Sequence, residues 1–225
     1  MNQAVIVRPA RLALLGGLVI ASLLAGTALA ADAGPQVVFK PDVGPDKSVA
    51  IFAGGCFWCM EQAFDPIKGV QATISGYTGG HVDNPTYGDV TSEDSGHTEA
   101  LKVIYDPKTV TYDRLLQVFW HNVDPTDSSG QFCDRGDSYR SEIFAVGDNQ
   151  IQTAEASKKA LLADKSAPSP IVTKIVPAVT FYPAEAYHQD YYKKNPLRYK
   201  FYHNACRRDA TLDKLWGNKA RTPAR

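Results

Sequence analysis

Short apolar runs separated by polar stretches and turn residues recur along this chain and indicate a mixed α/β domain. Short runs bounded by turn signals are typical of strands, whereas apolar residues that recur every three or four positions are typical of helices. The pattern predicts strands at residues 49–53, 70–77, 98–105, 142–146 and 171–176. It predicts helices at residues 57–64, 111–122, 149–164 and 184–194, with a final helical turn at 211–216.

The first six elements follow the order strand, helix, strand, strand, helix, strand, which is typical of a split βαβ unit. We therefore expect an α/β (α+β) fold of the ferredoxin-like plait type, a two-layer sandwich in which two helices cover one face of a sheet. Two long polar loops, residues 80–97 and 124–138, interrupt it, and later segments form a C-terminal extension. Loops of this length in a compact domain are usually functional.

The first thirty residues differ from the rest, because Arg8 and Arg11 are their only charged side chains and residues 12–24 are apolar. The small residues of Ala28-Leu29-Ala30 resemble a cleavage site, so residues 1–30 are predicted to be a secretory signal peptide. The alternative is a membrane anchor, but the apolar core is short for a span of about 20 residues. We expect export across the inner membrane to the periplasm.

The remaining domain boundaries follow from composition. A flexible leader at 31–47, a catalytic domain at 48–216 and a tail at 217–225 are expected. Lysine and arginine number 24, as do aspartate and glutamate, so no basic excess suggests nucleic acid. We expect no membrane association after signal cleavage, and nothing in the chain demands more than a monomer.

The chain has four cysteines, an even number that often means disulfides in an exported protein. Four are too few to build the scaffold of a chain long enough to bury its own core, so some are expected to serve chemistry. Cys56 follows Gly54 and Gly55 where a strand becomes a helix. A helix N-terminus stabilises a thiolate and lowers the pKa of the thiol, which makes Cys56 the candidate nucleophile. The alternative is an inert buried cysteine.

Cys59 completes a Cys-x-x-Cys motif with Cys56, which supports a thioredoxin-type dithiol or half of a zinc site. Zinc would need Cys133 and Cys206 as well, and these do not form a second close pair. We therefore expect no metal.

Glu99, at the start of a predicted strand, would be a proton donor in an apolar pocket, where its pKa rises, and an ordinary solvated carboxylate otherwise. Tyr87 and Tyr139 lie in or beside the long loops and could donate phenol hydrogen bonds to an oxygen atom, or simply pack. Asp134 precedes Arg135 and suits a turn as readily as a site.

Seven motifs in the chain together resemble the peptide methionine sulfoxide reductase A family, and they occur in family order between about residues 48 and 206. They are Gly54-Gly55-Cys56-Phe57-Trp58, Gly76-Tyr77-Thr78-Gly79-Gly80, Asn84-Pro85-Thr86-Tyr87, Gly96-His97-Thr98-Glu99-Ala100, Asp106-Pro107, Asp134-Arg135-Gly136-Asp137-Ser138-Tyr139-Arg140-Ser141 and Ala184-Glu185-Ala186-Tyr187-His188-Gln189-Asp190-Tyr191-Tyr192.

The resemblance implies reduction of the S epimer of methionine sulfoxide, free or in oxidised proteins. Cys56 would attack the sulfoxide sulfur, while Phe57 and Trp58 would hold the substrate methyl group. Glu99 would protonate the sulfoxide oxygen. Tyr87 and Tyr139 would assist with hydrogen bonds, and Asp134 would order the site through water or backbone contacts.

The resemblance also implies a thiol cycle without a bound cofactor. Cys56 would become a sulfenic acid, a second thiol would condense with it to a disulfide, and an external thioredoxin-like dithiol would reduce that disulfide. Family members often use a cysteine near the C-terminus, so Cys206 is the expected resolving cysteine, with Cys59 second and Cys133 third. Two alternatives remain: a thioredoxin-like disulfide oxidoreductase using Cys56 and Cys59, and a non-enzymatic exported domain held by zinc or disulfides.

Overall fold

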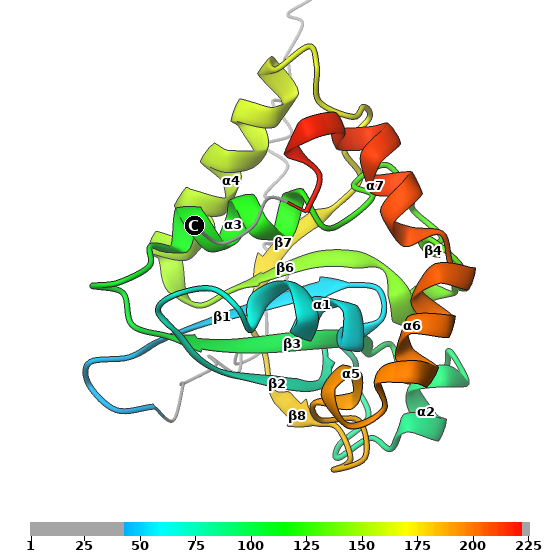
Figure 1. Cartoon of the computed structure of the whole chain (residues 1–225). Coiled ribbons are helices and arrows are strands. Elements are labelled where there is room, and N and C mark those ends of the chain that lie inside the picture. The colour runs from blue at the N-terminus through cyan, green and yellow to red at the C-terminus, as the bar shows by residue number, and fades with distance from the viewer. Residues whose placement is uncertain (1–42, 222–225) are drawn as a thin grey trace, which may run out of the picture. The chain divides into compact units, whose positions relative to one another are not determined.

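A computed structural model of the chain describes residues 43–221 (Figure 1). The predicted signal peptide and residues 31–42 of the predicted leader lie outside the described residues. Across residues 43–221, none of the helices combines the length and the apolar character needed to cross a lipid bilayer.

One six-stranded sheet organises the domain, in the order β7-β6-β1-β3-β2-β8. Neighbouring strands are antiparallel except for the parallel pair of β6 and β7. The strands are β1 (Ser48–Gly54), β2 (Val70–Thr78), β3 (Thr98–Tyr105), β6 (Ser141–Ala145), β7 (Lys174–Pro177) and β8 (Phe181–Pro183). β1 is buried on both faces, which explains why its sequence is a continuous apolar run.

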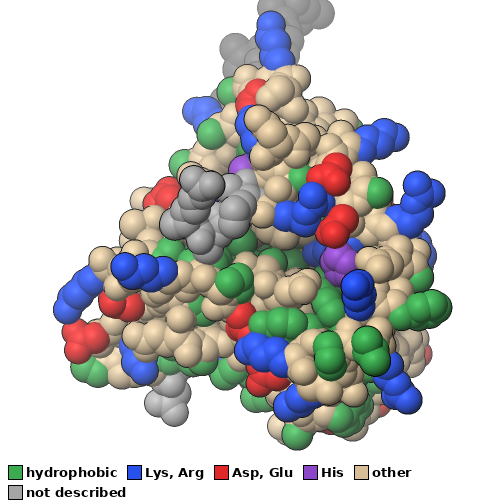
Figure 2. Space-filling view, in the orientation of Figure 1, with side chains coloured by type: hydrophobic (Ala, Val, Ile, Leu, Met, Phe, Trp, Pro, Cys, Tyr) green, Lys and Arg blue, Asp and Glu red, His purple; other side chains and the backbone are tan. Residues whose placement is uncertain are grey.

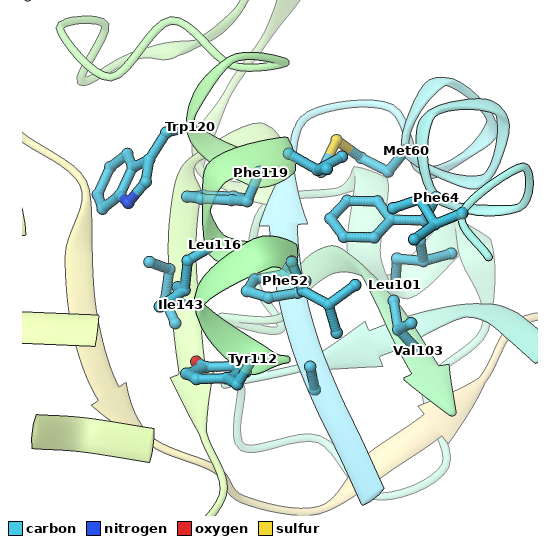
Figure 3. Close-up of a cluster of buried hydrophobic side chains, with 14 of the residues drawn as sticks. Phe52, Met60, Phe64, Leu101, Val103, Tyr112, Leu116, Phe119, Trp120 and Ile143 are labelled. Carbon is cyan, nitrogen blue, oxygen red and sulfur yellow. The ribbon is translucent and has the colours of Figure 1, made fainter. Parts of the chain in front are cut away.

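Four helices pack their apolar sides against one face of this sheet: α1 (Phe57–Phe64), α3 (Tyr112–Trp120), α4 (Gly147–Ala163) and α7 (Arg208–Trp216). Phe52 of β1 lies at the centre of the cluster (Figure 3), with its ring 5.2 Å from the rings of both Phe64 and Phe119. Because an aromatic side chain buries a large apolar area, the contacts of Phe52 stabilise the packing of both α1 and α3 against β1.

The α/β class is confirmed, but the structure differs from a simple plait in two respects. β7 and β8 extend the sheet at its two edges, and four helices rather than two cover its face. The long loops also contain structure: α2 (Tyr87–Thr91), the β4 (Gly130–Gln131) and β5 (Asp134–Arg135) hairpin, and η1 (Asp137–Tyr139). α2 begins with a capping box between Thr86 and Asp89, a local signal that the polar composition of the loop masks.

The predicted helix at residues 184–194 is wrong over most of its length. Only α5 (Tyr191–Lys194) is helical there, and α6 (Pro196–Ala205) follows it. Pro196 occupies the first turn of α6, where its missing N–H has no partner to lose, so it begins a helix rather than ending one. A short η2 turn (Gly217–Lys219) follows α7. Segments α5 to α7 bring the C-terminal part of the chain back to α1 (Figure 1).

Candidate active site

The turn from β1 into α1 places Cys56 at the N-cap of α1. Two glycines make this turn possible. A Cβ on Gly54 would lie 2.6 Å from the Met60 sulfur, and Gly55 has φ +74° with Gln131 only 2.5 Å from the position of its Cβ. Any larger residue would therefore clash, and at Gly55 it would also be strained. The predicted strand-to-helix cysteine is confirmed.

Cys59 lies one turn into α1, and its amide donates to the Cys56 carbonyl at 3.1 Å. The two thiols are free, buried and hydrogen-bonded to each other. Burial, followed by the interaction with Cys59, raises the pKa of the Cys56 thiol. The hydrogen bond from Cys56 is the main cause that lowers the pKa of Cys59, to about 7. The expected lowering of the Cys56 pKa is thus wrong for this state, because burial outweighs the helix terminus.

Glu99 is buried, and burial raises the pKa of its carboxyl group well above the usual range. The Phe57 amide, in the first turn of α1, donates to Glu99 Oε2 at 3.0 Å. Of the two environments considered for Glu99, the structure therefore has the buried one. An uncharged carboxylic acid faces the N-terminus of α1, within electrostatic reach of Cys56.

Tyr87 and Tyr139 bring their hydroxyl groups together and hydrogen-bond each other. Burial, and then the nearby Glu99, raises the pKa of both phenols, so both keep their protons. Glu185 positions this group, since its carboxylate accepts from the Tyr87 amide and from the Tyr77 hydroxyl, each at 2.8 Å. Two residues from separate loops thus meet beside Glu99, as an oxygen-binding pair requires.

Phe57 and Trp58 differ in their accessibility. Phe57 is 1% exposed and packs within a cluster that contains Tyr77, whereas Trp58 is only partly buried. The Trp58 ring stacks on Tyr191 at 3.7 Å, and its N–H donates to Nδ1 of the buried His188 at 3.2 Å. Trp58 therefore offers a fixed aromatic surface, with Phe57 behind it.

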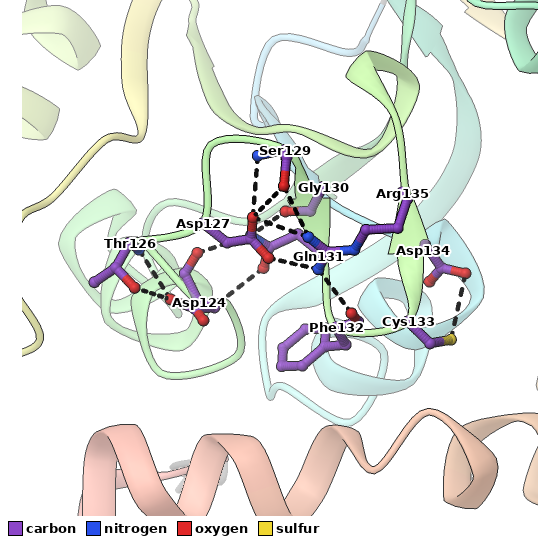
Figure 4. A network of polar contacts seen from close by, with 10 residues as sticks. All are labelled: Asp124, Thr126, Asp127, Ser129, Gly130, Gln131, Phe132, Cys133, Asp134 and Arg135. Atoms are coloured by element: carbon purple, nitrogen blue, oxygen red, sulfur yellow. Dashed lines mark hydrogen bonds and ion pairs between the residues drawn. The ribbon is translucent and has the colours of Figure 1, made fainter.

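Asp134 lies on β5 next to Cys133 (Figure 4), whose sulfur is bonded to Cys206. Its Oδ2 accepts from the Tyr202 hydroxyl at 2.6 Å, and its Oδ1 is 3.6 Å from Cys133 Sγ. Burial raises the pKa of Asp134, opposed by the Tyr202 hydrogen bond. The carboxyl group is close enough to act electrostatically on Cys56, so the structure gathers Asp134 into the same site.

The four cysteines form two separate pairs rather than one four-sulfur cluster. Cys133 and Cys206 are bonded to each other, and Cys56 and Cys59 remain thiols. The ligand atoms of Cys133, Asp134 and Cys206 lie within 4.8 Å of one another, but two of them are the bonded sulfurs. In this state Cys206 has no free thiol with which to attack Cys56, whereas Cys59 has one.

Several site residues come from the C-terminal third and were not singled out from the sequence. They are Tyr199, Tyr202 and Arg208, which are buried or half-buried around α1, whereas Glu185 and the buried His188 belong to the motif at residues 184–192. The density of tyrosines between residues 187 and 202 was the available signal. Tyrosines of this kind bury their rings and direct their hydroxyls to polar partners, as Tyr199 does to Gln62 at 2.6 Å.

The part of this chain that resembles known proteins includes all of these site residues. The family model described as "Peptide methionine sulfoxide reductase" matches residues 48–220. The protein named "Peptide methionine sulfoxide reductase MsrA" from Bacillus subtilis (strain 168) is 49% identical over 173 residues, covering 77% of this chain and 98% of that protein. Its namesake from Listeria welshimeri is 53% identical over 167 residues, covering 74% and 94%.

Solved structures agree. Methionine sulfoxide reductase A of Corynebacterium diphtheriae has a TM-score of 0.63 and 34% identity, covering 72% of this chain and 83% of that one. Mxr1 from Saccharomyces cerevisiae in reduced form has a TM-score of 0.63 and 32% identity, covering 68% and 88%.

Proposed function

Since the chain belongs to the peptide methionine sulfoxide reductase family and is an oxidoreductase that reduces methionine sulfoxide, we propose that it acts on the S epimer through the Cys56 thiol. The observation that carries the mechanism is a neutral, buried carboxylic acid, Glu99, held at the same helix N-terminus as the thiol. Sulfoxide reduction needs both groups, because oxygen leaves sulfur readily only after it is protonated.

The chemistry follows from the hydrogen bonds of Glu99. Its Oε2 accepts from the Phe57 amide, so the acidic proton is placed on Oε1 and is available to the sulfoxide oxygen. As Cys56 attacks the substrate sulfur, Glu99 donates this proton and recovers the one that the thiol loses. Oxygen is transferred to Cys56, methionine leaves, and Cys56 is a sulfenic acid.

The tyrosine pair stabilises the oxygen during this step. Both phenols stay protonated and lie next to Glu99, so each can donate to the oxygen as it gains negative charge. Trp58 supplies a partly exposed aromatic wall for the substrate methyl group, because His188 and Tyr191 hold its ring in place. Asp134 contributes through its bond to Tyr202 rather than by touching substrate.

The thiol that resolves the sulfenic acid is proposed to be Cys59 instead of Cys206. Cys59 is a free thiol hydrogen-bonded to Cys56, whereas Cys206 is bonded to Cys133. Cysteines spaced in this way at a helix N-terminus support reversible disulfides in other oxidoreductases. The resulting Cys56–Cys59 disulfide would be reduced by an external thioredoxin-like dithiol, with no bound cofactor.

The proposed compartment is the periplasm, on the evidence of the predicted signal peptide at residues 1–30. Cell fractionation and N-terminal sequencing test this point independently of the chemistry. A mature N-terminus at Ala31 in the periplasmic fraction is expected, and an intact Met1 in the cytoplasm would contradict it.

The activity itself is tested with the mature protein, dithiothreitol and each separated epimer of a methionine sulfoxide peptide, followed by mass spectrometry. Conversion of the S epimer alone is expected, with none in Cys56→Ser. Without dithiothreitol, Cys59→Ser should complete one turnover and then accumulate a sulfenic acid that dimedone traps. Conversion of the R epimer, or full activity of Cys56→Ser, would refute the proposal.

A further inference from the structure

Arg208 is a buried cation beneath the active-site turn. It begins α7, is 4% exposed, and its guanidinium lies 4.2 Å from the Phe132 ring. Its Nη2 donates to the carbonyls of Asn122 and Gly54, at 2.6 and 3.3 Å. Among residues 43–221, no carboxylate forms an ion pair with it. Asp134 interacts with it electrostatically without direct contact. A buried charge that no carboxylate contacts is costly, so its presence here calls for an explanation.

The position of Arg208 relative to the two thiols supplies an explanation for this buried charge. Gly54, which accepts from the guanidinium, lies two residues before Cys56, and Met60, whose sulfur is 3.6 Å from Nη2, directly follows Cys59. A pocket of about 390 Å³ between α1 and α7 has both Cys59 and Arg208 in its wall. Glu99 is absent from that wall. Cys59 and the cation therefore share one pocket wall, and the proton donor does not line that pocket.

The surface above this pocket is mixed in charge, so it does not by itself neutralise Arg208. Figure 2 shows basic and acidic side chains gathered together over α7. Arg221 pairs with Asp213, and His203 lies 3.7 Å from Asp209. The side chains of Arg221, Asp213 and Asp209 are 39%, 53% and 52% exposed, so water screens their charges.

Four groups set the ionisation of Cys59: Cys56 at the N-cap of α1, Tyr199 on α6, Asp134 on β5 and Arg208 on α7. The buried Glu99 on β3 also interacts electrostatically with Cys59. Cys56 and Tyr199 donate hydrogen bonds that favour its thiolate, and Arg208 adds the only positive charge among these four. Burial and Asp134 oppose ionisation. The hydrogen bond from Cys56 is lost once Cys56 is a sulfenic acid, whereas the charge of Arg208 persists.

We propose that Arg208 is the counter-ion of a Cys59 thiolate and thereby activates Cys59 to attack the oxidised Cys56. This rests on the proposed function, in which Cys59 resolves the sulfenic acid. The Cys59 thiolate attacks Cys56 Sγ, a sulfur–sulfur bond forms and the sulfur–oxygen bond of the sulfenic acid breaks. The leaving hydroxide takes up a proton and departs as water. Arg208 touches neither reacting atom, so it is a positioning residue that acts through the thiolate fraction of Cys59.

Substitution of Arg208 separates the two steps of the cycle. In Arg208→Met, the first turnover should still form methionine, and the sulfenic acid trapped by dimedone should then persist roughly tenfold longer, since one pKa unit changes the thiolate fraction tenfold. Lys214→Met is the matched control, because it removes an exposed cation from the same helix. That control should resolve at the rate of the unaltered protein.

A direct titration gives the readout that a merely structural role would not change. In a Cys56→Ser background, the pH dependence of Cys59 alkylation reports its ionisation. The midpoint should rise by about one pH unit with Arg208→Met and stay near its original value with Arg208→Lys, which keeps the charge. Equal behaviour of the Met and Lys variants, or an unchanged midpoint in both, would overturn the proposal.

A folding defect in both variants leaves a test in the protein with Arg208 intact. There, Cys59 in Cys56→Ser should titrate below the usual thiol value of about 8.5. A midpoint at or above that value would overturn the role of Arg208. Failure of the first turnover in the unaltered protein would instead refute the proposed function, so the two failures are distinguishable.

Discussion

Replacement of Glu99 by glutamine tests the proposed acid most directly. Glutamine keeps the size of the side chain, and its carbonyl oxygen can still accept from the Phe57 amide, as Oε2 does at 3.0 Å. What it cannot do is release a proton at neutral pH. General acid catalysis contributes roughly 100- to 10,000-fold to a rate, so Glu99→Gln should raise the barrier of the first step by about 3 to 5 kcal/mol.

The pH dependence of the first turnover gives the second signature. Burial raises the pKa of Glu99, so the unaltered protein holds the proton at neutral pH and loses it as the pH rises through that raised value. The rate should therefore fall on the alkaline side through loss of the acid, and this fall should be absent from the residual rate of Glu99→Gln.

Glu99→Gln should lower activity without lowering the free energy of unfolding. Because the folded protein binds the Glu99 proton more tightly than the unfolded chain, the free energy of unfolding decreases as pH rises above the usual carboxyl range. Glu99→Gln removes this cost and should be at least as stable as the unaltered protein at alkaline pH. An inactive variant that is also less stable there would indicate structural damage instead.

The assay is rapid-quench measurement of methionine from an S-sulfoxide peptide without reductant, with urea unfolding measured in parallel. Glu61→Gln is the matched control, since Glu61 is also a buried carboxyl group with a raised pKa but lies about one turn along α1 from the N-terminus that Glu99 faces. A first-turnover rate for Glu99→Gln within about tenfold of the original would refute the acid role, because it falls below the range for general acid catalysis.

Three further outcomes are expected. Phe52→Ala should lower the free energy of unfolding by about 3 to 5 kcal/mol in urea titration, because it empties the centre of the aromatic cluster; a loss below about 1 kcal/mol would contradict that packing. Burial raises the pKa of Glu61 to about 7, so the free energy of unfolding falls as pH rises from 4.5 through 7. In the same assay, Glu61→Gln should therefore raise the free energy of unfolding by about 3 kcal/mol at pH 8 and leave it unchanged at pH 4. An equal gain at both pH values would refute the titration. Replacing both Cys133 and Cys206 with serine removes a link across 73 residues and should lower the free energy of unfolding by about 4 kcal/mol. The first turnover should still proceed. Loss of that turnover in folded protein would show that the disulfide takes part in it.

The central elements could be predicted from the sequence because their signals are local. The apolar run of β1 and the two glycines before Cys56 fixed the strand-to-helix turn, and the periodicity of residues 111–122 gave α3 within a residue or two. Glu99 could be named but not placed, since its burial depends on α1 and on loops far away in sequence.

The C-terminal part could not be predicted in the same way, because its burial is achieved by polar aromatic side chains. Tyr199 and Tyr202 of α6 bury their rings and hydrogen-bond to Gln62 and Asp134, so α6 lacks a clear apolar stripe. The pairing of Cys133 with Cys206 likewise depends on where α6 ends, which no local pattern fixes.

One sequence argument that failed concerned the Cys56 pKa, and its failure bears on how the site works. A helix N-terminus favours a thiolate, but burial next to Cys59, Glu99 and Asp134 opposes one, and burial is the largest effect. Cys56 therefore rests as a thiol, and a thiol is a poor target for oxidants. Its proton can leave when a substrate occupies the pocket and Glu99 gives its own proton to the sulfoxide oxygen. Coupling the two transfers would limit the reactivity of Cys56 to sulfoxides, which would be an advantage in the oxidising periplasm that is proposed as its compartment.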